Sequence, residues 1–230
     1  MPTKLKTYYI MNIELLTKPS LAQTLESQAA KIMRDYLTDS IPNEVEGQIF
    51  IVSNIKLFGQ QARDVDLAVF GSLSNFKMLD YYEDDSGSPK DILVNDFFII
   101  IDLKSHSLDM ISCKDSHVFA DYSGTTKDIT KSLEDLRYSI GNYLRVHHID
   151  IIVSNAIWFL SITKDELNGL ELGHDMGVLP KSFNFKDIID VIISQGNKPV
   201  YDRASDCYVL SSGVKKEEYS VLRHLLHHDL

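Results

Sequence analysis

The chain is poor in cysteine and has no long apolar run. Its two cysteines, Cys113 and Cys207, are too few for a disulfide framework and lack a CxxC spacing. The longest apolar runs, 97–101 and 156–160, are far shorter than the roughly 20 residues of a membrane-spanning helix. The first residues are basic, but no apolar segment of a secretory signal follows them. We therefore expect a protein of a reducing, cytoplasmic compartment that does not associate with membranes.

Basic residues are also fewer than acidic ones. The 230 residues hold 23 Lys+Arg against 33 Asp+Glu, a net charge of −10, which argues against a protein that holds nucleic acid by bulk electrostatics alone. Contact with phosphate would need a local basic patch, a metal ion or a partner domain. Hydrophobic residues make up 44% of the chain, enough for one globular domain with a sizeable core, and no internal repeat is visible.

Hydrophobic periodicity predicts the order helix, three strands, helix, strand over the first two thirds of the chain. The first helix is expected to start at a capping box of Ser20 and Gln23 and to end at about Leu37. Two segments without a clear apolar pattern, 71–96 and 116–126, are interpreted as a long exposed loop and a turn region. The remaining expected elements are a strand hairpin at 48–57 and 65–70, a strand at 97–104, a helix at 129–144, and strand segments at 149–153 and 156–160.

The pattern changes from Thr163 onward. It predicts a short helix at 185–194, a strand at 207–210 and a helix from about Lys215 that runs to the end of the sequence. We therefore divide the chain into a core, 1–162, and a small α/β extension, 163–230. Because the last helical pattern stops abruptly, we expect the extension to lead into a further domain of a longer protein.

Acidic residues at the ends of two apolar strands are the most informative chemical feature. Side chains alternate along a strand, so Asp102 and Lys104 project from one face, and Asp66 begins the apolar part of its own strand. Charges at the ends of buried strands need compensation. A divalent cation between Asp66 and Asp102 would supply it, with Lys104 orienting or helping to deprotonate an attacking water. For the DxK pattern alone, a solvated strand edge or an ion pair is the simpler explanation.

Taken in order, these elements resemble the PD-(D/E)xK nuclease superfamily, and in particular its nuclease-related domain (NERD) family. In the resemblance, Glu26 matches the acid of the first helix, Asp66 the acid of the hairpin, and Asp102 with Lys104 the final motif. The segment 119–130 is similar to the one that leads such domains into their second core helix. The similarity covers about residues 20 to 160.

The resemblance implies a restriction-endonuclease-like core, a central mixed sheet flanked by helices in the order α-β-β-β-α-β. It implies a DNA-cleaving, Mg²⁺-dependent (or Mn²⁺-dependent) phosphodiester hydrolase. Asp66, Asp102 and the backbone carbonyl of Leu103 would be metal ligands, and Glu26 would bind a second metal or its water. The sequence departs from the family in Asp102, where Glu is usual, in Ser132, where Gln is common, and in the length of the segment 71–96.

Partners follow from the same resemblance. Such domains are often fused to helicase, ATPase or kinase-like regions, including in bacterial defence systems, so a fused or associated helicase or ATPase region would supply the affinity for DNA. The alternative is a catalytically inactive nuclease-fold module that binds a protein partner or forms a homo-oligomer through its sheet and the extension after Thr163.

Other catalytic motifs are weaker. The histidine pairs His147/His148 and His227/His228, with His224, have no acid at HExxH spacing and are interpreted as solvated or helix-terminal residues. No phosphate-binding glycine loop and no nucleophile elbow is present. Trp158 and Phe159 are expected in the core.

Overall fold

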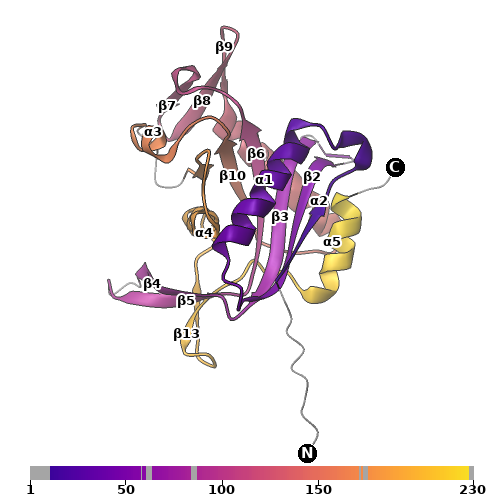
Figure 1. Ribbon diagram of the computed structural model, residues 1–230, viewed down its shortest axis with the longest axis vertical. Helices are drawn as coiled ribbons and strands as arrows, with labels where there is room; N and C mark the ends of the chain where they lie inside the picture. The colour runs from indigo at the N-terminus through magenta and orange to yellow at the C-terminus, as the bar shows by residue number, and fades with distance from the viewer. Residues whose placement is uncertain are drawn as a thin grey trace, which may run out of the picture.

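A mixed sheet forms the centre of the molecule in the computed structural model, which describes residues 11–57, 59–60, 64–83, 87–170, 172 and 176–227. Its strand order is β1-β2-β3-β6-β10-β11 (Figure 1). β3 runs antiparallel to β2 and β6, and the other neighbours pair in parallel. The strands are β1 (Asn12–Leu16), β2 (Glu46–Lys56), β3 (Asp64–Ser74), β6 (Asp96–Lys104), β10 (Ser154–Phe159) and β11 (Val178–Leu179).

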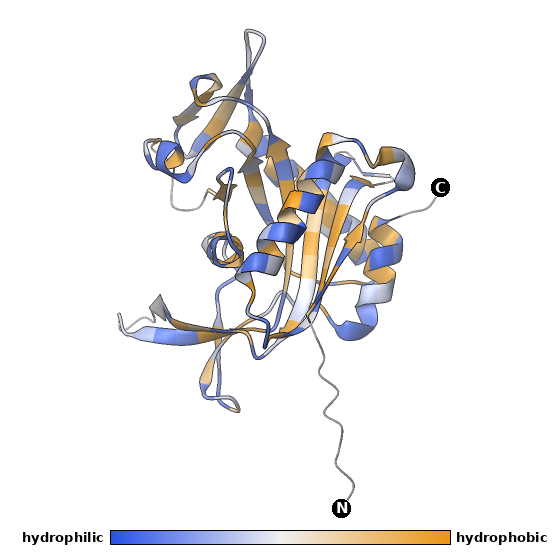
Figure 2. Ribbon diagram, in the orientation of Figure 1, coloured by the Kyte–Doolittle hydropathy of each residue, from blue (hydrophilic) through white to orange (hydrophobic). Residues whose placement is uncertain are grey.

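Helices cover both faces of this sheet. α1 (Leu25–Ser40) and α4 (Phe185–Ser194) pack on one face, and α2 (Ile129–Val146) and α5 (Tyr219–Leu226) pack on the other. The central strands are mostly hydrophobic, and the exposed sides of the helices are hydrophilic (Figure 2). The expected α/β architecture with a central mixed sheet flanked by helices is therefore confirmed. The short helices are η1 (Pro19–Leu21), η2 (Leu108–Met110), α3 (Lys164–Asn168) and η3 (Lys216–Glu218).

The β2–β3 hairpin and strand β6 form as predicted, because their apolar residues alternate between two buried faces. Ile49 and Ile51 face the α1 side, and Phe50 and Val52 face the α2 side. Gly71 lets the two hairpin backbones approach, since a Cβ at this position would lie 2.3 Å from the carbonyl oxygen of Gln48. Trp158 and Phe159 are buried in the core, as expected.

The predictions for α2 and α4 are confirmed, but the predicted start of the first helix is wrong. The Ser20–Gln23 capping box does not form, and Ser20 lies in η1. The cap of α1 is Thr24, whose hydroxyl accepts from the backbone N–H of Ser27 at 3.3 Å. The capping-box signature favoured Ser20, which has Gln23 three places on, over Thr24, which has Ser27 there.

The interpretation of 71–96 as a long exposed loop is also wrong. β3 extends to Ser74, and Ile92 and Val94 are fully buried. Acidic residues interrupt the alternation of apolar positions here, which hid the strands from periodicity. Asp80 lies in a strand and not in an acidic loop. The segment supplies β4 (Lys77–Glu83) and β5 (Pro89–Val94) to a second sheet of order β12-β13-β5-β4, which is completed by β12 (Val200–Asp202) and β13 (Cys207–Leu210).

The region 116–126 is a strand hairpin with tight turns and not merely a turn region. A three-stranded antiparallel sheet, β7 (Ile111–Lys114), β8 (His117–Tyr122) and β9 (Thr125–Asp128), is inserted between β6 and α2. Its hairpins turn where Asp115, Ser116, Ser123 and Gly124 adopt positive φ. The sheet projects beyond the upper end of the central strands in Figure 1.

Two further expectations need correction. The segment 149–153 is not a strand, and β10 starts only at Ser154, in the gap between the two expected strand segments. β1 was not predicted, because its five residues include the polar Asn12 and Glu14.

The expected division after residue 162 stays a prediction, although both core clusters contain residues from before and after it. Of the described helices, none is long and apolar enough to cross a membrane. Cys113 and Cys207 are free thiols.

Candidate functional site

Asp66 and Asp102 lie side by side where β3 and β6 separate. The registered pairs of the two strands end at Leu67 and Ile101, and the next residue outward on each strand is the aspartate. Both side chains project from the α2 face, because Ala68 and Ile100, two residues away on each strand, belong to the core cluster on that face. The alternation predicted from the sequence therefore brings the two carboxylates together.

The Asp66 carboxylate is anchored to the end of β6. The backbone N–H of Leu103 donates to Asp66 Oδ2 at 2.8 Å, in place of a further backbone pair between the strands. Burial, the largest influence, and the adjacent Asp102 raise the pKa of Asp66 to about 7, although the Leu103 N–H and Lys104 oppose this rise. Asp66 thus holds a proton easily near neutral pH when no cation replaces it.

Asp102 and Lys104 form a largely buried ion pair. Lys104 Nζ lies 2.5 Å from Asp102 Oδ2, with side-chain exposures of 13% for the lysine and 19% for the aspartate. Burial lowers the pKa of Lys104, but the Asp102 carboxylate, with smaller contributions from Tyr122 and Asp66, reverses the effect and leaves the pKa raised. Lys104 is therefore held as a cation. This charge state suits the stabilisation of negative charge better than removal of a proton from water.

A cleft opens beside this pair, between the ends of the central strands, the β8–β9 hairpin and α2. Its volume is about 300 Å³. Tyr122 lies between two other side chains, with its ring centroid 4.6 Å from that of His106 and 4.9 Å from Lys127 Nζ. The lining residues are Asp64, Asp102, Lys104, Tyr122, Lys127, Ile129, Ser132, Leu133 and Leu136.

Sequence reasoning missed two of these residues as functional candidates. Tyr122 and Lys127 lie in the segment compared with the family, but they were not singled out, because only the hairpin geometry of β8 and β9 aims them at the cleft. Ser132, noted at the position where the family often has Gln, also lines the cleft. Its hydroxyl is occupied by a hydrogen bond to the backbone carbonyl of Asp128 at 3.0 Å.

Glu26 is not brought into this cluster. It lies in the first turn of α1, the helix that covers the opposite face of the sheet, and it makes no hydrogen bond or ion pair with Asp66, Asp102 or Lys104. Ser27, its neighbour, is fully buried in a polar cluster with Ser53 and Asn54. α1 therefore starts at the same end of the sheet as the aspartates but on its other side.

The donors at the cleft fit a hard divalent cation that keeps part of its water shell. Across the described ranges, no group of three or more His, Cys, Asp or Glu side chains is arranged to hold a metal. Mg²⁺ is usually bound by one or two carboxylates, with waters and substrate oxygens completing its shell, so Asp66 and Asp102 match its demands. The Leu103 carbonyl points to the same edge of β6 as its N–H, toward Asp66, beyond the last registered pair.

The histidine candidates lie elsewhere. His147 caps the carboxyl end of α2 and, like His148, is exposed. His224 lies in the last turn of α5, and His227 follows it. His228 lies outside the described residues. None of the described histidines lines the cleft beside Lys104.

Comparison with known proteins gives no relative. No family model, no curated protein and no solved structure matches the chain. The function of the chain must therefore be inferred from its residues and their geometry.

Proposed function

We propose that this protein is a metal-dependent nuclease that hydrolyses phosphodiester bonds in DNA, built on a restriction-endonuclease-like core. The observation that carries the proposal is the convergence of Asp66, Asp102 and Lys104, of which Asp102 and Lys104 line one cleft. Two adjacent carboxylates and a cationic lysine are the groups that phosphoryl chemistry needs, a cation site next to a donor for developing negative charge.

Asp66 and Asp102 would hold Mg²⁺ or Mn²⁺, with the Leu103 carbonyl as a further ligand. When bound, the cation would polarise the scissile phosphate and lower the pKa of a bound water. The chain's own contribution is to place two carboxylates on one face of the sheet and to fix Asp66 through the Leu103 N–H. Glu26 lies over the other face, so the proposal does not depend on it.

Lys104 would act on the phosphate. Its raised pKa keeps it protonated, so it can donate to a phosphate oxygen and stabilise the charge that develops in the transition state. Lys127 would contact a neighbouring phosphate, since its ammonium lies over the Tyr122 ring at the same cleft and forms no ion pair with a described residue. These two lysines are the local basic feature that a chain of net charge −10 requires.

DNA affinity beyond these contacts would come from a fused or associated helicase or ATPase region. This part of the proposal rests on the resemblance to nuclease-related domains and on the acidic net charge. Under the same proposal, the protein would act in DNA processing or in defence against phage.

One observation favours a second candidate, an inactive nuclease-fold module that binds a protein or a second copy of itself. The short ion pair between Lys104 and Asp102 satisfies both charges without a metal, and Asp64, the other acid that lines the cleft, is paired with Lys56. A site that is already neutralised could persist for structural reasons alone.

The experiment that separates the two candidates is cleavage of circular DNA with Mg²⁺, with Mn²⁺ and with EDTA. The nuclease proposal predicts nicked and linear products only with a divalent cation, and no products from Asp102→Ala. Asp135→Ala is the matched control, because this exposed aspartate on α2 lies outside the cleft. Intact circles under all conditions with wild-type protein would favour the binding module.

A further inference from the structure

A second and larger cavity lies at the opposite end of the β2–β3 hairpin. Glu46 pairs with Ser74 at this end, whereas the aspartate site begins where Lys56 pairs with Asp64. Ser72 and Asp66 are six residues apart on β3, a separation of about 20 Å at the usual rise of a strand. The cavity measures about 670 Å³, within the range typical of small-molecule sites.

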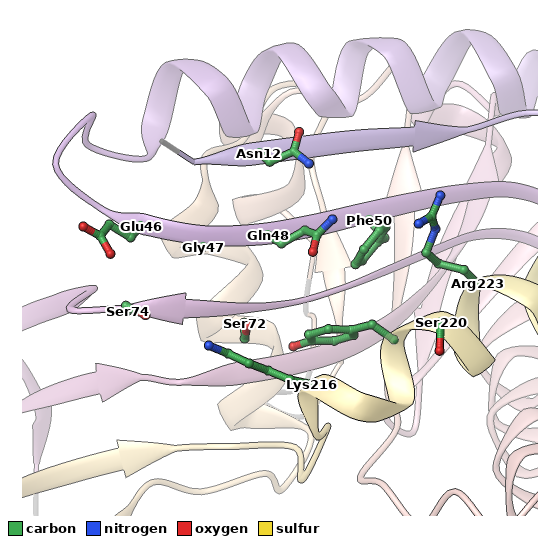
Figure 3. Close-up of a pocket in the computed structure, with 11 residues that line it drawn as sticks. Asn12, Glu46, Gly47, Gln48, Phe50, Ser72, Ser74, Lys216, Ser220 and Arg223 are labelled. Atoms are coloured by element: carbon green, nitrogen blue, oxygen red, sulfur yellow. The ribbon is translucent and has the colours of Figure 1, made fainter. Parts of the chain in front are cut away.

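The cavity has a sheet floor and a helical wall. Its floor is formed by β1, β2 and β3, and its wall by η3 and α5 (Figure 3). Small side chains at Ser72, Ser74 and Ser220 leave the space open. Gly47 lets β2 and β3 pair closely beneath the cavity, because a Cβ there would lie 2.3 Å from the Ser72 carbonyl oxygen. The lining residues are Asn12, Glu46, Gly47, Gln48, Phe50, Ser72, Ser74, Lys216, Tyr219, Ser220 and Arg223.

One polar group in the wall is buried without a hydrogen bond. Tyr219 is only 7% exposed, and its buried hydroxyl makes no hydrogen bond of standard geometry with a described residue, although it lies close to the Ser72 side chain. Its ring is fixed against Phe50 and Phe70, at centroid distances of 5.6 Å and 6.2 Å. A buried hydroxyl without a partner costs about 1–3 kcal/mol, so a ligand that bonds to it would recover stability.

The charges of the cavity are arranged along its length. Arg223 lies at one end and Glu46 at the other, and the ammonium of Lys216 points away from Arg223, toward Ser72 (Figure 3). Lys216 forms no ion pair with a described residue. Arg223 Nη2 contacts Glu14 Oε1 at 2.5 Å, which uses one of the five N–H donors of its guanidinium and keeps it over the Phe50 ring. Lys216 is therefore the cation that points at the floor of the cavity, whereas Arg223 is engaged with Glu14 at one end.

Neutral hydrogen-bonding groups occupy the space between these charges. The carboxamide of Gln48 and the hydroxyl of Ser72 lie along the floor, and the carboxamide of Asn12 lies at its edge (Figure 3). Cationic side chains recognise phosphate through charge-assisted hydrogen bonds, and carboxylates and carboxamides accept from sugar hydroxyls. A ligand that matches this order is anionic at one end and carries hydroxyl groups at the other.

We propose that this cavity binds a small phosphate ester of a hydroxyl-bearing sugar, as a free sugar phosphate or as a mononucleotide. Lys216 contacts the phosphate together with the hydroxyls of Ser72 and Tyr219, and the carboxamides of Gln48 and Asn12 bond to the sugar hydroxyls. The proposal does not depend on the nuclease activity, because no residue of this cavity belongs to the cleft at Lys104.

Calorimetric titration tests this site with ribose 5-phosphate and with AMP, in EDTA so that the aspartate site stays free of metal. At least one ester should bind, and adenosine, ribose and inorganic phosphate should bind more weakly than that ester. Comparison of the two esters identifies the source, since ribose 5-phosphate lacks the base. Lys216→Ala should weaken binding about tenfold or more, the usual cost of a lost charge-assisted hydrogen bond.

Two variants make the test specific. Lys215→Ala is the control for Lys216→Ala. Lys215 is the neighbouring residue, its Nζ lies 3.9 Å from Glu218 Oε1, and it does not line the cavity. Tyr219→Phe should bind the ester more weakly yet melt no lower than wild type, since it removes an unsatisfied hydroxyl and keeps the ring. No heat from either ester, equal binding of adenosine and AMP, or equal affinity of the Lys216 and Lys215 variants would overturn the proposal.

Discussion

Lys104 Nζ lies 2.5 Å from Asp102 Oδ2, so the two charged residues of the DxK pattern neutralise each other at the end of β6. The same strand end holds Asp66 through the Leu103 N–H. A cation that binds the aspartates would replace Lys104 as the partner of Asp102 and free the lysine for substrate. The metal-free protein would then be a closed form of the site, in which the lysine occupies the place of the cation.

The raised pKa of Asp66 predicts how stability depends on pH without metal. Asp66 has a pKa of about 7 in the fold against 3.8 for an ordinary aspartate, so between these values the folded state binds more protons than the unfolded chain. The contribution of Asp66 is therefore fully present below about pH 4 and is lost as the pH rises through 7, by at most about 4 kcal/mol. Urea unfolding in EDTA at pH 5 and pH 8 measures this loss.

Asp66→Asn is the control for that experiment. The amide keeps the size of the side chain but cannot ionise, so the variant should lose less stability than wild type between pH 5 and pH 8. If the unfolding free energies of the two proteins fall by the same amount between pH 5 and pH 8, Asp66 does not titrate in this range.

The same proton linkage predicts that metal stabilises the protein more at high pH. Mg²⁺ or Mn²⁺ must compete with a proton on Asp66, so the rise in melting temperature at millimolar metal should be larger at pH 8 than at pH 5.5. Asp102→Ala should lose this rise, and Asp135→Ala should retain it. An equal rise at both pH values, or one that survives Asp102→Ala, would place the metal elsewhere.

Gly71 offers a test of the fold that is independent of function. Gly71→Ala would place a Cβ 2.3 Å from the carbonyl oxygen of Gln48 in the neighbouring strand, which should cost about 3 kcal/mol of unfolding free energy. Gly141→Ala is the matched control, because the residue is inside α2 and the added Cβ would have no atom within 4 Å apart from its chain neighbours and the backbone of its own helix. The control should be neutral or more stable by about 0.5–1 kcal/mol in chemical denaturation. Equal stability of the two variants would contradict the register of the hairpin.

Lys127 is predicted to contribute to DNA binding and not to metal binding. Lys127→Ala should weaken the association of the protein with a labelled duplex in EDTA, and the slope of log affinity against log salt should fall by about 1. Lys114→Ala, an exposed lysine of β7 outside the cleft, should change neither quantity. Fluorescence anisotropy over a salt series measures both. Identical slopes for the two variants would remove Lys127 from the interface.

A long hydrophobic periodicity predicted the elements that bury the most apolar surface. α4 has the bounds 185–194 expected from the sequence, and β6 differs by one residue, because these elements carry a clear 3.6-residue or two-residue repeat. The hairpin β4–β5 was missed, since Asp80 and Asp91 break its alternation and the burial of Ile92 depends on distant segments such as β13. Such strands are stabilised by tertiary packing, and the local sequence does not reveal that packing.

Only part of the candidate site could likewise be predicted from the sequence. The convergence of Asp66 and Asp102 followed from strand alternation and from the antiparallel pairing of neighbours in the chain. The position of Glu26 did not follow from the sequence. The helical pattern shows which side of α1 is buried, but it does not show on which face of the sheet α1 packs. The positions of Tyr122 and Lys127 depend on the inserted sheet of β7, β8 and β9, which the hydrophobic periodicity did not predict.

The measurement that tests the central claim most directly is single-turnover cleavage of circular DNA by Lys104→Ala, together with its melting temperature with and without Mg²⁺. A lysine that acts on developing charge contributes mainly in the transition state, whereas a ligand already contributes in the ground state. The account predicts that Lys104→Ala loses cleavage by at least about a hundredfold and keeps the metal-induced stabilisation, while Asp102→Ala loses both. Cleavage by Lys104→Ala at the wild-type rate, or wild-type protein that leaves the circles intact with Mg²⁺ and with Mn²⁺, would contradict it.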